Sequence, residues 1–451
     1  MHAGIRTVLR GIQPFTVKIN AEILLVLSFI LVILLGSLLL YLPFAHVKPI
    51  SYLDCLFTST SAVCVTGLIV KDTGQDFTPA GQGIILLLIQ LGGLGLMTFV
   101  AFFSSLFNRR LSLNSKAAIY GVFFQRDMAR DFKKIILRIL LLTGGIELAG
   151  ACVLFARIGK PFSALFHSIS AFCNAGFSLY PTSFMAFHTD PWIMAAIILL
   201  IVAGGIGYIV YFDLFDGLRN KWRFPKQRVY LTLHSRLALV TTGVLIVGGT
   251  VAVLVFGMNS QGDWPQKILD SLFQSVTART AGFNSVDIAH LPVATLMILA
   301  LLMFIGGSPG SCAGGIKTTT CATFTAFVYQ RLKGKKSTHL FGRRIASSSL
   351  EKITVLLALS VAWNVLGAVL LPAFESAAEG IHLQHLVFEQ LSAFGTVGLS
   401  TGITPSLCAA SKIWLILTMF LGRLGPLTVA VVAVSRKAQL YDYPEGTILI
   451  G

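Results

Sequence analysis

The segment "LFTSTSAVCVTGL" (Leu56–Leu68) decides the fold of this chain, because three further copies of it follow along the sequence. Each copy is semi-polar, ends on Gly-Leu or Gly-Phe, and lies between two long hydrophobic stretches. The other copies read "LFHSISAFCNAGF" (Leu165–Phe177), "LFQSVTARTAGF" (Leu272–Phe283) and "VFEQLSAFGTVGL" (Val387–Leu399). Four repeats of a span, a re-entrant segment and a second span predict one ion pore built from a single chain.

A second glycine-rich signature follows each copy at a steady distance. It begins 25, 28, 24 and 24 residues after the last glycine of the copy, which is Gly67, Gly176, Gly282 or Gly398. Two signatures that keep their spacing in all four copies indicate internal repetition of the whole unit. The second signatures read "GGLG" (Gly92–Gly95), "GGIG" (Gly204–Gly207), "GGSPG" (Gly306–Gly310) and "GRLG" (Gly422–Gly425).

The composition places the chain in a membrane. Of its 451 residues, 55% are hydrophobic and 12% are charged, whereas about a quarter of the residues of a soluble protein are charged. A helix needs ~20 apolar residues to cross a bilayer, and eight stretches qualify: 20–44, 80–107, 135–158, 191–215, 234–257, 291–327 (interrupted), 350–373 and 411–435. We therefore expect an all-α integral membrane protein with eight transmembrane spans. Its four span–pore helix–span repeats would surround one central pore in a pseudo-fourfold arrangement.

The positive charge indicates the topology. Of 35 Lys and Arg residues, 26 lie at the N-terminus, in every second connection and at the C-terminus. The positive-inside rule then places both termini and the basic loops in the cytoplasm. We read the net charge of +16 mainly as this topology signal, with membrane lipid headgroups or a cytosolic protein as further partners and no nucleic acid.

These signals divide the chain into nine parts. The four repeats cover 19–108, 133–218, 234–332 and 346–435, and the third contains an intramembrane loop at 306–316. The cytosolic parts are the N-terminus 1–18, the loops 109–132, 219–233 and 333–345, and the tail 436–451.

Each re-entrant segment begins with a stretch that predicts a short helix. Asp54, Ser163, Asp270 and His385 occupy the same place in the four copies, and the first three are of types that suit an N-cap. Such a helix is too short to span the bilayer, so it must enter and return on one side. Because the basic loops are assigned to the cytoplasm, that side is extracellular. Its C-terminal end carries about −0.5 of a charge, and four such ends around a pore favour a cation.

The residues after each predicted helix are candidates for an ion-selectivity filter. Non-helical backbone at membrane depth is tolerated only where it is buried or lines a wet cavity. Its carbonyls can replace the hydration shell of K⁺ or Na⁺, and glycine supplies the required φ values. Glycines that only allow close helix packing are the alternative. The filter candidates are Val63, Cys64, Val65, Thr66, Gly67, Cys173, Asn174, Ala175, Gly176, Thr280, Ala281, Gly282, Thr396, Val397 and Gly398.

Over nearly its whole length the chain resembles the Trk/Ktr/HKT superfamily of cation transporters. The resemblance rests on the four repeats, on one filter glycine in each, and on "GGSPGSCAGGIKTTT" (Gly306–Thr320). The short N-terminus is most similar to bacterial Ktr membrane subunits (the KtrB type). The resemblance implies potassium uptake, often sodium-dependent, across a bacterial plasma membrane. It also implies a homodimer with one pore per protomer, resting on cytosolic RCK-type, nucleotide-binding regulatory subunits (KtrA-like).

A gate is expected in the sixth span. Five glycines and one proline within Gly306–Gly315 predict a broken helix, because both residue types are unfavourable in helices; a simple kink is the alternative. In the related family the matching loop acts as the gate. The gate candidates are Gly306, Gly307, Ser308, Pro309, Gly310, Ser311, Cys312, Ala313, Gly314, Gly315, Lys317 and Arg423.

Intramembrane charges complete the list of candidates. Arg423 lies mid-span, where a charge normally faces a cavity or a partner, so we expect it to contact the loop at 306–316 unless it extends to the membrane surface. Arg279 is expected to brace the third filter segment from behind. Glu147 and Glu389 are candidate partners for these cations, although sequence cannot assign the pairs.

Other functions are less consistent with these patterns. An alternating-access transporter usually has inverted repeats, whereas these repeats share one orientation. A sodium or Na⁺/K⁺ translocator of the same superfamily stays open. "GSCAGGIKT" (Gly310–Thr318) lacks the glycine that a phosphate-binding loop has before its lysine, so we expect no nucleotide on this chain. No catalytic motif stands out, and we expect no enzyme.

Overall fold

The computed structural model describes residues 21–94, 132–224, 230–257, 263–376, 380–426 and residue 428. The predicted N-terminal segment 1–18, nearly all of the basic loop 109–132 and the tail 436–451 lie outside the described residues. So do the far ends, 95–107 and 429–435, of two predicted spans.

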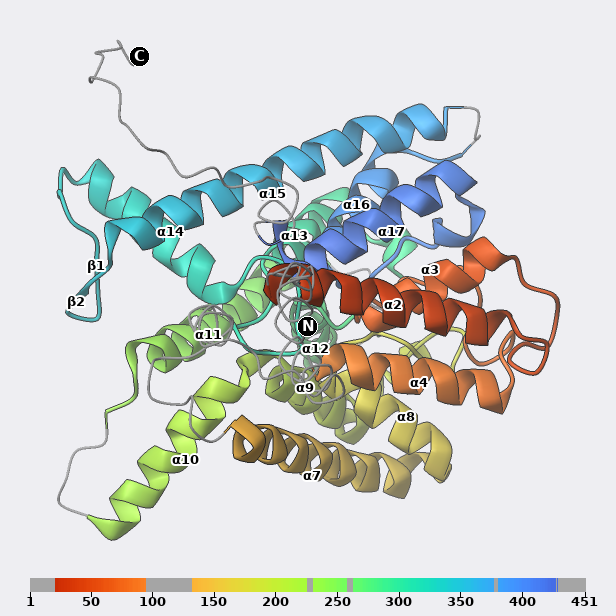
Figure 1. The fold of residues 1–451 in the computed structure, drawn as a ribbon, viewed down its shortest axis with the longest axis horizontal. Coiled ribbons are helices and arrows are strands. Elements are labelled where there is room, and N and C mark those ends of the chain that lie inside the picture. Colours follow the sequence, from red (N-terminus) through yellow and green to blue (C-terminus); the bar gives the residue numbers. More distant parts are fainter. Residues whose placement is uncertain are drawn as a thin grey trace, which may run out of the picture.

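Nearly all regular structure is helical, in four successive units (Figure 1). The first two units contain α2 (Ala21–Tyr41), α3 (Tyr52–Val63) and α4 (Pro79–Gly93), then α7 (Phe132–Ile158), α8 (Pro161–Phe172), α9 (Pro191–Ile206) and α10 (Tyr208–Arg223). The last two contain α11 (Leu233–Val255), α12 (Trp264–Thr277), α13 (Val293–Phe304) and α14 (Thr318–Leu332), then α15 (Ser347–Phe374), α16 (Leu383–Gly395) and α17 (Ala409–Leu424). Short 3₁₀ turns lie at Met185–Phe187, Ile288–His290 and Thr404–Ser406.

A small hairpin corrects the expectation of an all-α chain. Strands β1 (His339–Leu340) and β2 (Arg343–Arg344) pair antiparallel within the predicted loop 333–345. The turn between them has φ values of 48° at Phe341 and 78° at Gly342. Two positive φ values in a two-residue turn match the twist of paired strands, so a hairpin forms there in place of irregular loop.

The four short helices begin earlier than expected, by about two turns in the third and about one turn in the others. The N-cap positions are Ser51, Lys160, Asp263 and His382. At the first of them, the Ser51 side chain accepts a hydrogen bond from the Asp54 N–H. The prediction that Asp54, Ser163 and Asp270 are N-caps is therefore wrong, because these side chains lie inside their helices and make other contacts.

The short helices pack in a closed series. Each of α3, α8, α12 and α16 contacts the long helix before it and the apolar helix after it. In addition α4 contacts α8, α9 contacts α12, α13 contacts α16, and α17 contacts α3. The last contact joins the end of the described chain to its beginning, so the four units close on one another. The first phenylalanine of each copy, on the short helix, is almost fully buried: Phe57, Phe166, Phe273 and Phe388.

A glycine in the long helix lets each short helix approach closely. In the first three units a Cβ added to Gly36, Gly150 or Gly249 would clash with the serine hydroxyl of the short helix. That hydroxyl donates to the carbonyl three residues before the glycine, at 2.7, 2.6 and 2.9 Å for Ser59, Ser168 and Ser275. In the fourth unit Gln390 takes the serine's place and accepts from Trp414 Nε1 at 2.8 Å.

Span lengths agree with a membrane protein without fixing the number of spans. Within the described residues, three helical stretches are long and apolar enough to cross a bilayer: Ile136–Ile158, Leu233–Val255 and Ser347–Phe374. Shorter apolar helices lie at Leu25–Tyr41, Pro79–Gly93 and Val293–Phe304. Eight spans remains a prediction.

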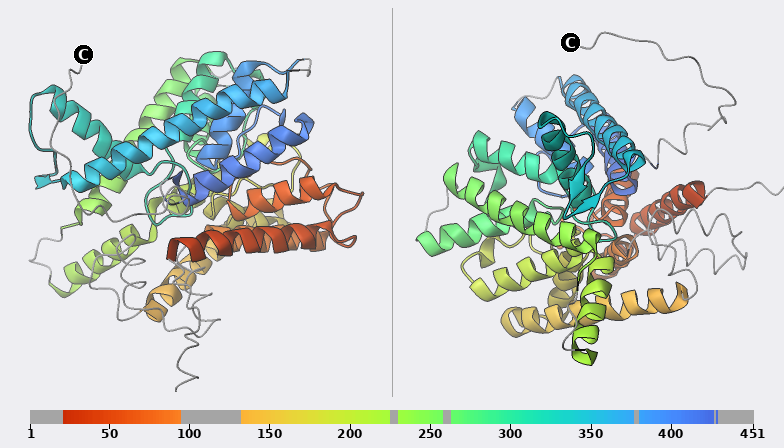
Figure 2. Two further views of the ribbon diagram at one scale, coloured as in Figure 1. Left: turned by 45° about the horizontal axis from the view of Figure 1, so that its top comes forward. Right: turned by 90° about the vertical axis from the view of Figure 1, so that its left-hand side faces the viewer.

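The predicted continuous stretch 191–215 is wrong. It breaks at Gly207 into α9 and α10, which are bent by 93°, and α10 projects from the bundle (Figure 2). Gly207 has φ 97° and ψ 141°, a conformation open essentially to glycine alone. Apolar residues continue across the break, and an isolated glycine gives only a weak signal for it.

Candidate functional site

The four final glycines of the copies meet at one place, and we call them the glycine ring (Gly67, Gly176, Gly282, Gly398). All four have positive φ, between 72° and 91°. A Cβ added to each would approach the carbonyl oxygen just before the next glycine: Ala175 at 2.5 Å, Ala281 at 2.8 Å, Val397 at 2.2 Å and Thr66 at 2.2 Å. Both the backbone conformation and the space therefore require glycine at these positions.

The backbone before each glycine is also unusual. The residue two positions before it has positive φ: 56° at Val65, 59° at Asn174, 80° at Thr280 and 49° at Thr396. For β-branched residues such as valine and threonine this conformation is a genuine outlier. Backbone strain of this kind, repeated at one register in four segments, persists only where the surroundings hold it and is typical of functional sites.

A hydroxyl at one register of each short helix holds the strained segment. Ser61 and Ser392 accept from the N–H groups of Gly67 and Gly398, both at 3.1 Å. Ser170 donates to the Phe177 carbonyl at 2.8 Å. Thr277 accepts from the Phe283 N–H at 2.8 Å. The sequence reasoning missed these four residues, although a hydroxyl in the same place of every copy was visible.

The predicted filter residues do not all lie in the ring. Val63 is the last residue of α3, and Cys64 and Cys173 are C-caps with helical backbone. The ring contains the four glycines and the carbonyl-bearing residues before them: Thr66, Ala175, Ala281 and Val397. Among the described residues, the buried hydroxyls of Thr66, Thr280 and Thr396 have no hydrogen-bond partner.

The second glycine signature marks a close approach. A Cβ on Gly92, Gly204 or Gly422 would lie 2.0, 1.7 or 2.0 Å from the carbonyl of Val63, Phe172 or Phe394, at the end of the short helix of the same unit. Gly306 departs from this pattern, because its missing Cβ faces the Gly314 carbonyl of its own loop. The loop 306–316 thus occupies the place that a helix takes in the other units.

That loop is bonded into the break of α9 and α10. Ser308 N–H donates to the Gly205 carbonyl at 2.9 Å, and Cys312 N–H donates to the Gly204 carbonyl at 3.1 Å. In return the Tyr208 N–H donates to the Gly310 carbonyl at 3.0 Å. The carbonyls freed by the broken helix are therefore satisfied by the loop, and a movement of either segment would disturb the other.

Two cations, the buried Arg423 and the half-buried Lys317, donate to carbonyls of the loop or beside it. Arg423, 7% exposed, donates to the carbonyls of Cys312 and Gly92. Lys317 Nζ donates to the Ala313 carbonyl at 2.6 Å. Arg423 therefore does not extend to a membrane surface; it bridges the loop and α4.

The buried carboxylates have other partners than these cations. Glu147 accepts from Gln90 Nε2 at 3.1 Å. Glu389 accepts from Ser400, Thr401 and Thr404 at 2.5–3.1 Å, so it braces the segment after the fourth ring glycine. Arg279 lines a small cavity beside α9 and α11, and its Nε has no hydrogen-bond partner within the described part of the chain.

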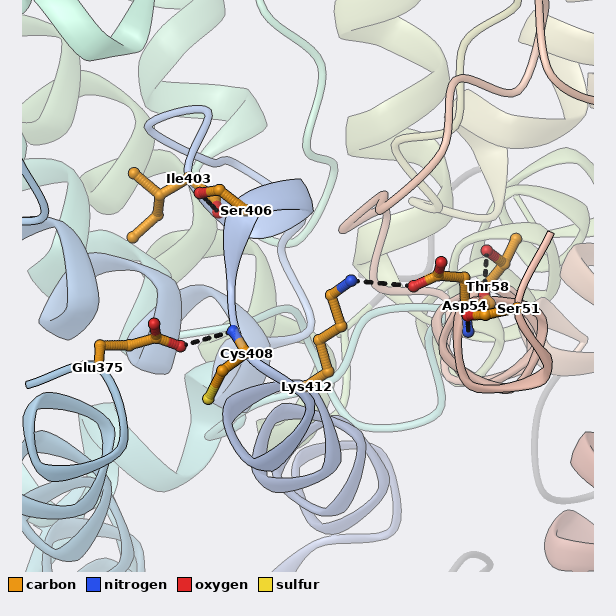
Figure 3. A network of polar contacts seen from close by, with 8 residues as sticks. All are labelled: Ser51, Asp54, Thr58, Glu375, Ile403, Ser406, Cys408 and Lys412. Carbon is orange, nitrogen blue, oxygen red and sulfur yellow. Dashed lines mark hydrogen bonds and ion pairs between the residues drawn. The ribbon is translucent and has the colours of Figure 1, made fainter. Parts of the chain in front are cut away.

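An ion pair joins the last unit to the first on the side where the short helices begin. Lys412 Nζ of α17 lies 2.9 Å from Asp54 Oδ1 of α3 (Figure 3). Beside it, Glu375 accepts from the Cys408 N–H at the start of α17, at 2.8 Å. Burial alone would raise the pKa of Glu375, but hydrogen bonds from Ser411 and Cys408 and the charge of Lys412 outweigh it and hold the pKa below its usual range.

Comparison with known proteins identifies the family. The profile of the TrkH family, described as a cation transport protein, matches residues 10–441. The chain belongs to the TrkH family. It is a multi-pass membrane protein of mostly helical structure.

Relatives of known name cover nearly the whole chain. Ktr system potassium uptake protein B of Bacillus subtilis is 36% identical, over 96% of this chain and 98% of its own length. Potassium/sodium uptake protein NtpJ of Enterococcus hirae is 34% identical, over 95% and 96%. The crystal structure of TrkH from Vibrio parahaemolyticus has a TM-score of 0.75 at 19% identity, over 94% of this chain and 86% of that one, and it shows the shared fold of this TrkH-family chain.

Proposed function

We propose that this chain takes up potassium ions across the plasma membrane through a channel-like pore at the centre of four pseudo-fourfold units. The observation that carries the proposal is the closed order of the glycine ring, in which each glycine abuts the carbonyl before the next. A ring of backbone carbonyls can replace the hydration shell of a cation.

The surroundings of the ring favour a cation. Four short helices end at it, and the C-terminal end of a helix carries about −0.5 of a charge. The unpartnered hydroxyls of Thr66, Thr280 and Thr396 are additional oxygen ligands. Inward movement of one charge gains about 2.3 kcal/mol per 100 mV of membrane potential, so the pore needs no chemical reaction to drive uptake, and we propose no enzymatic role.

The ion assignment rests on the relatives. Potassium is the ion in the names of both relatives, and the second name adds sodium. We therefore propose K⁺ as the main substrate. Na⁺, as a coupling ion or a second substrate, is the alternative that the NtpJ relationship favours.

We further propose that the loop 306–316 is the gate. In support, it lies where the other three units have helix packed on the end of the short helix, and the Arg423 charge is bonded to it. An arginine under the ring is a barrier to cations as long as the loop stays in place. If so, Arg423→Ala should raise K⁺ flux in liposomes without any other protein, whereas the exposed Arg157→Ala should not. Equal flux in all three proteins would contradict the gate.

The proposed assembly follows from the resemblance to Ktr systems. It is a homodimer on cytosolic RCK-type regulatory subunits, which bind the nucleotide, with both termini in the cytoplasm. Co-purification of the full chain with such a subunit, and flux that responds to nucleotide only in its presence, would test this assembly.

The function itself is tested in a bacterial host that lacks K⁺ uptake. We expect the chain to restore growth at low K⁺, with or without a regulatory subunit, and to give saturable K⁺ uptake. Uptake of Na⁺ in the absence of K⁺ would favour the alternative. Protein present in the membrane without either flux would refute the proposal.

A further inference from the structure

An apolar groove lies beside the loop 306–316. It has a volume of about 520 Å³, and residues from the end of α13, the start of α14 and the middle of α15 line it, among them Phe304, Ile305, Ile316, Phe324, Leu357 and Ala358. A methylene group takes up about the volume of a water molecule, ~30 Å³. The groove therefore has room for on the order of fifteen methylene groups.

The groove is continuous with an exposed apolar surface of α15. Val361 lines the groove and is 50% exposed, and Val365 lies one turn further along α15 and is 58% exposed. Both belong to a helix that is long and apolar enough to cross the membrane. In a bilayer the medium outside this surface is hydrocarbon, so an acyl chain can enter the groove from the side.

A basic cluster lies at the ends of two helices that line the groove, α14 and α15. It consists of seven exposed residues at the end of α14, in the hairpin and at the start of α15: Arg331, Lys333, Lys335, Lys336, Arg343, Arg344 and Lys352. Among the described residues, none of the seven forms an ion pair with a carboxylate. The only acidic residue within 331–352 is Glu351. Such a cluster beside a span attracts anionic headgroups.

The hairpin that carries part of the cluster is held in place. Gln330 of α14 donates to the His339 carbonyl at 2.7 Å and accepts from the His339 N–H at 2.9 Å. Arg236 of α11 lies 4.4 Å from the centre of the Phe341 ring. The hairpin that contains Arg343 and Arg344 is thus held by contacts with both α11 and α14.

The separation of groove and cluster fits one phospholipid. Phe324 lines the groove, and Arg331 of the cluster follows it by seven residues along α14, a rise of about 10 Å. We propose that the groove holds one acyl chain of an anionic phospholipid whose phosphate is bound by the basic cluster.

The bound chain contacts the anchors of the loop. Ile305 and Ile316 line the groove and are the residues that pair where the loop begins and ends, with the Gly306 N–H donating to the Ile316 carbonyl at 2.8 Å. An acyl chain there presses on both anchors and holds the loop in place. This second consequence rests on the gate function proposed above, whereas the lipid site itself does not.

Binding is tested on the full chain purified in detergent. We expect native mass spectrometry to show retained phosphatidylglycerol at least fivefold over phosphatidylcholine when both are offered equally. Ala358→Phe, which fills the groove, should reduce retention of both lipids. Arg343→Gln with Arg344→Gln and Lys352→Gln should keep retention but remove the preference. Val369→Phe, which lies two turns beyond Val361 on the same helix and is 63% exposed, is the matched control and should behave as the unsubstituted chain.

Two further measurements keep the proposal open to refutation if a variant fails to fold. A phosphatidylglycerol with a photoreactive acyl chain should label peptides that contain Phe324 or Leu357 in the unsubstituted protein, and labelling elsewhere only would overturn the site. If the unsubstituted protein shows no headgroup preference, the lipid site is overturned as well. If Ala358→Phe changes the oligomeric state without loss of lipid, a second copy of the chain covers the groove, and this too overturns the site. Lipid retention that changes without any change in K⁺ flux would refute the gate consequence alone.

Discussion

Replacement of Gly282 by serine tests the glycine ring most directly. Its φ of 76° costs any other residue about 1–2 kcal/mol. In addition the new Cβ would lie 2.2 Å from the Val397 carbonyl oxygen and 3.1 Å from the Gly398 Cα. Because real Cβ contacts are essentially never closer than 3.0 Å, the carbonyl or the whole segment must move by roughly 1 Å.

A carbonyl that has moved this far is lost as an ion ligand. Hydrogen bonds to charged groups are worth about 1.5–3 kcal/mol, and we take one cation–carbonyl contact to be of similar strength. At about 1.4 kcal/mol per factor of ten, the apparent K⁺ affinity should fall roughly ten- to hundredfold. Gly176→Ser should be milder, since its Cβ would lie 2.8 Å from the nearest atom. The assay is the K⁺ dependence of initial uptake rates in a host without other K⁺ uptake.

The chain offers a matched control for backbone strain. Gly402 has φ 87°, yet a Cβ there would meet nothing within 4 Å. Gly402→Ser should therefore share the strain of Gly282→Ser and leave the apparent K⁺ affinity unchanged. Equal affinities for Gly282→Ser and the unsubstituted chain, with equal amounts of protein in the membrane, would refute the ring as an ion site. Equal losses in both variants would assign the effect to strain.

Three further predictions concern the supports of the site. Ser61→Ala and Ser392→Ala each remove the hydroxyl that accepts a hydrogen bond from a ring-glycine N–H. Each should destabilise the ring by about 1 kcal/mol and weaken the preference for K⁺ over Na⁺ in uptake competition. Ser406→Ala, at an exposed serine, is the control and should do neither. Lys412→Met leaves the Asp54 carboxylate, whose side chain is 12% exposed, without its partner. It should lower the free energy of unfolding by about 1–3 kcal/mol, as measured by thermal unfolding. If the charge-swapped protein (Asp54→Lys with Lys412→Asp) regains no stability, the ion pair is contradicted as the cause. Because the pKa of Glu375 is depressed, its contribution to stability is present above the ordinary glutamate pKa of ~4.3 and is lost as the pH falls through the folded-state pKa. Glu375→Gln should therefore lower the unfolding temperature at pH 7 but not in strong acid. A difference in unfolding temperature that does not depend on pH would refute this explanation.

Hydrophobic periodicity and internal repetition were sufficient to predict individual elements of the fold. Four copies with two aligned glycine signatures located the short helices, the ring glycines and the loop at 306–316. Local chemistry was less reliable. Asp54 and Asp270 are good N-cap types, but α3 begins about one turn earlier, where Ser51 caps it, and α12 begins about two turns earlier, after Asp263. The break at Gly207 escaped notice because apolar residues continue on both sides of it.

Contacts between units could not be read from the chain. Arg423 was expected to meet the loop, but only the structure places Gly92 of the first unit as its other acceptor. Glu147 and Glu389 were considered as partners of the cations, whereas they accept from amide, thiol and hydroxyl groups. A buried carboxylate needs hydrogen-bond donors, and which donors it finds depends on helices that are distant in sequence.

The sequence by itself determined the membrane class, the four repeats and the positions where only glycine serves, because hydropathy and backbone freedom are properties of single residues and their spacing. The tertiary structure decided how the units close. The Asp54–Lys412 pair joins residues 358 positions apart, and the loop 306–316 bonds into a helix break about 100 residues earlier in the chain. Such contacts form because buried polar groups must find partners wherever packing brings them together, and no local pattern records where that is.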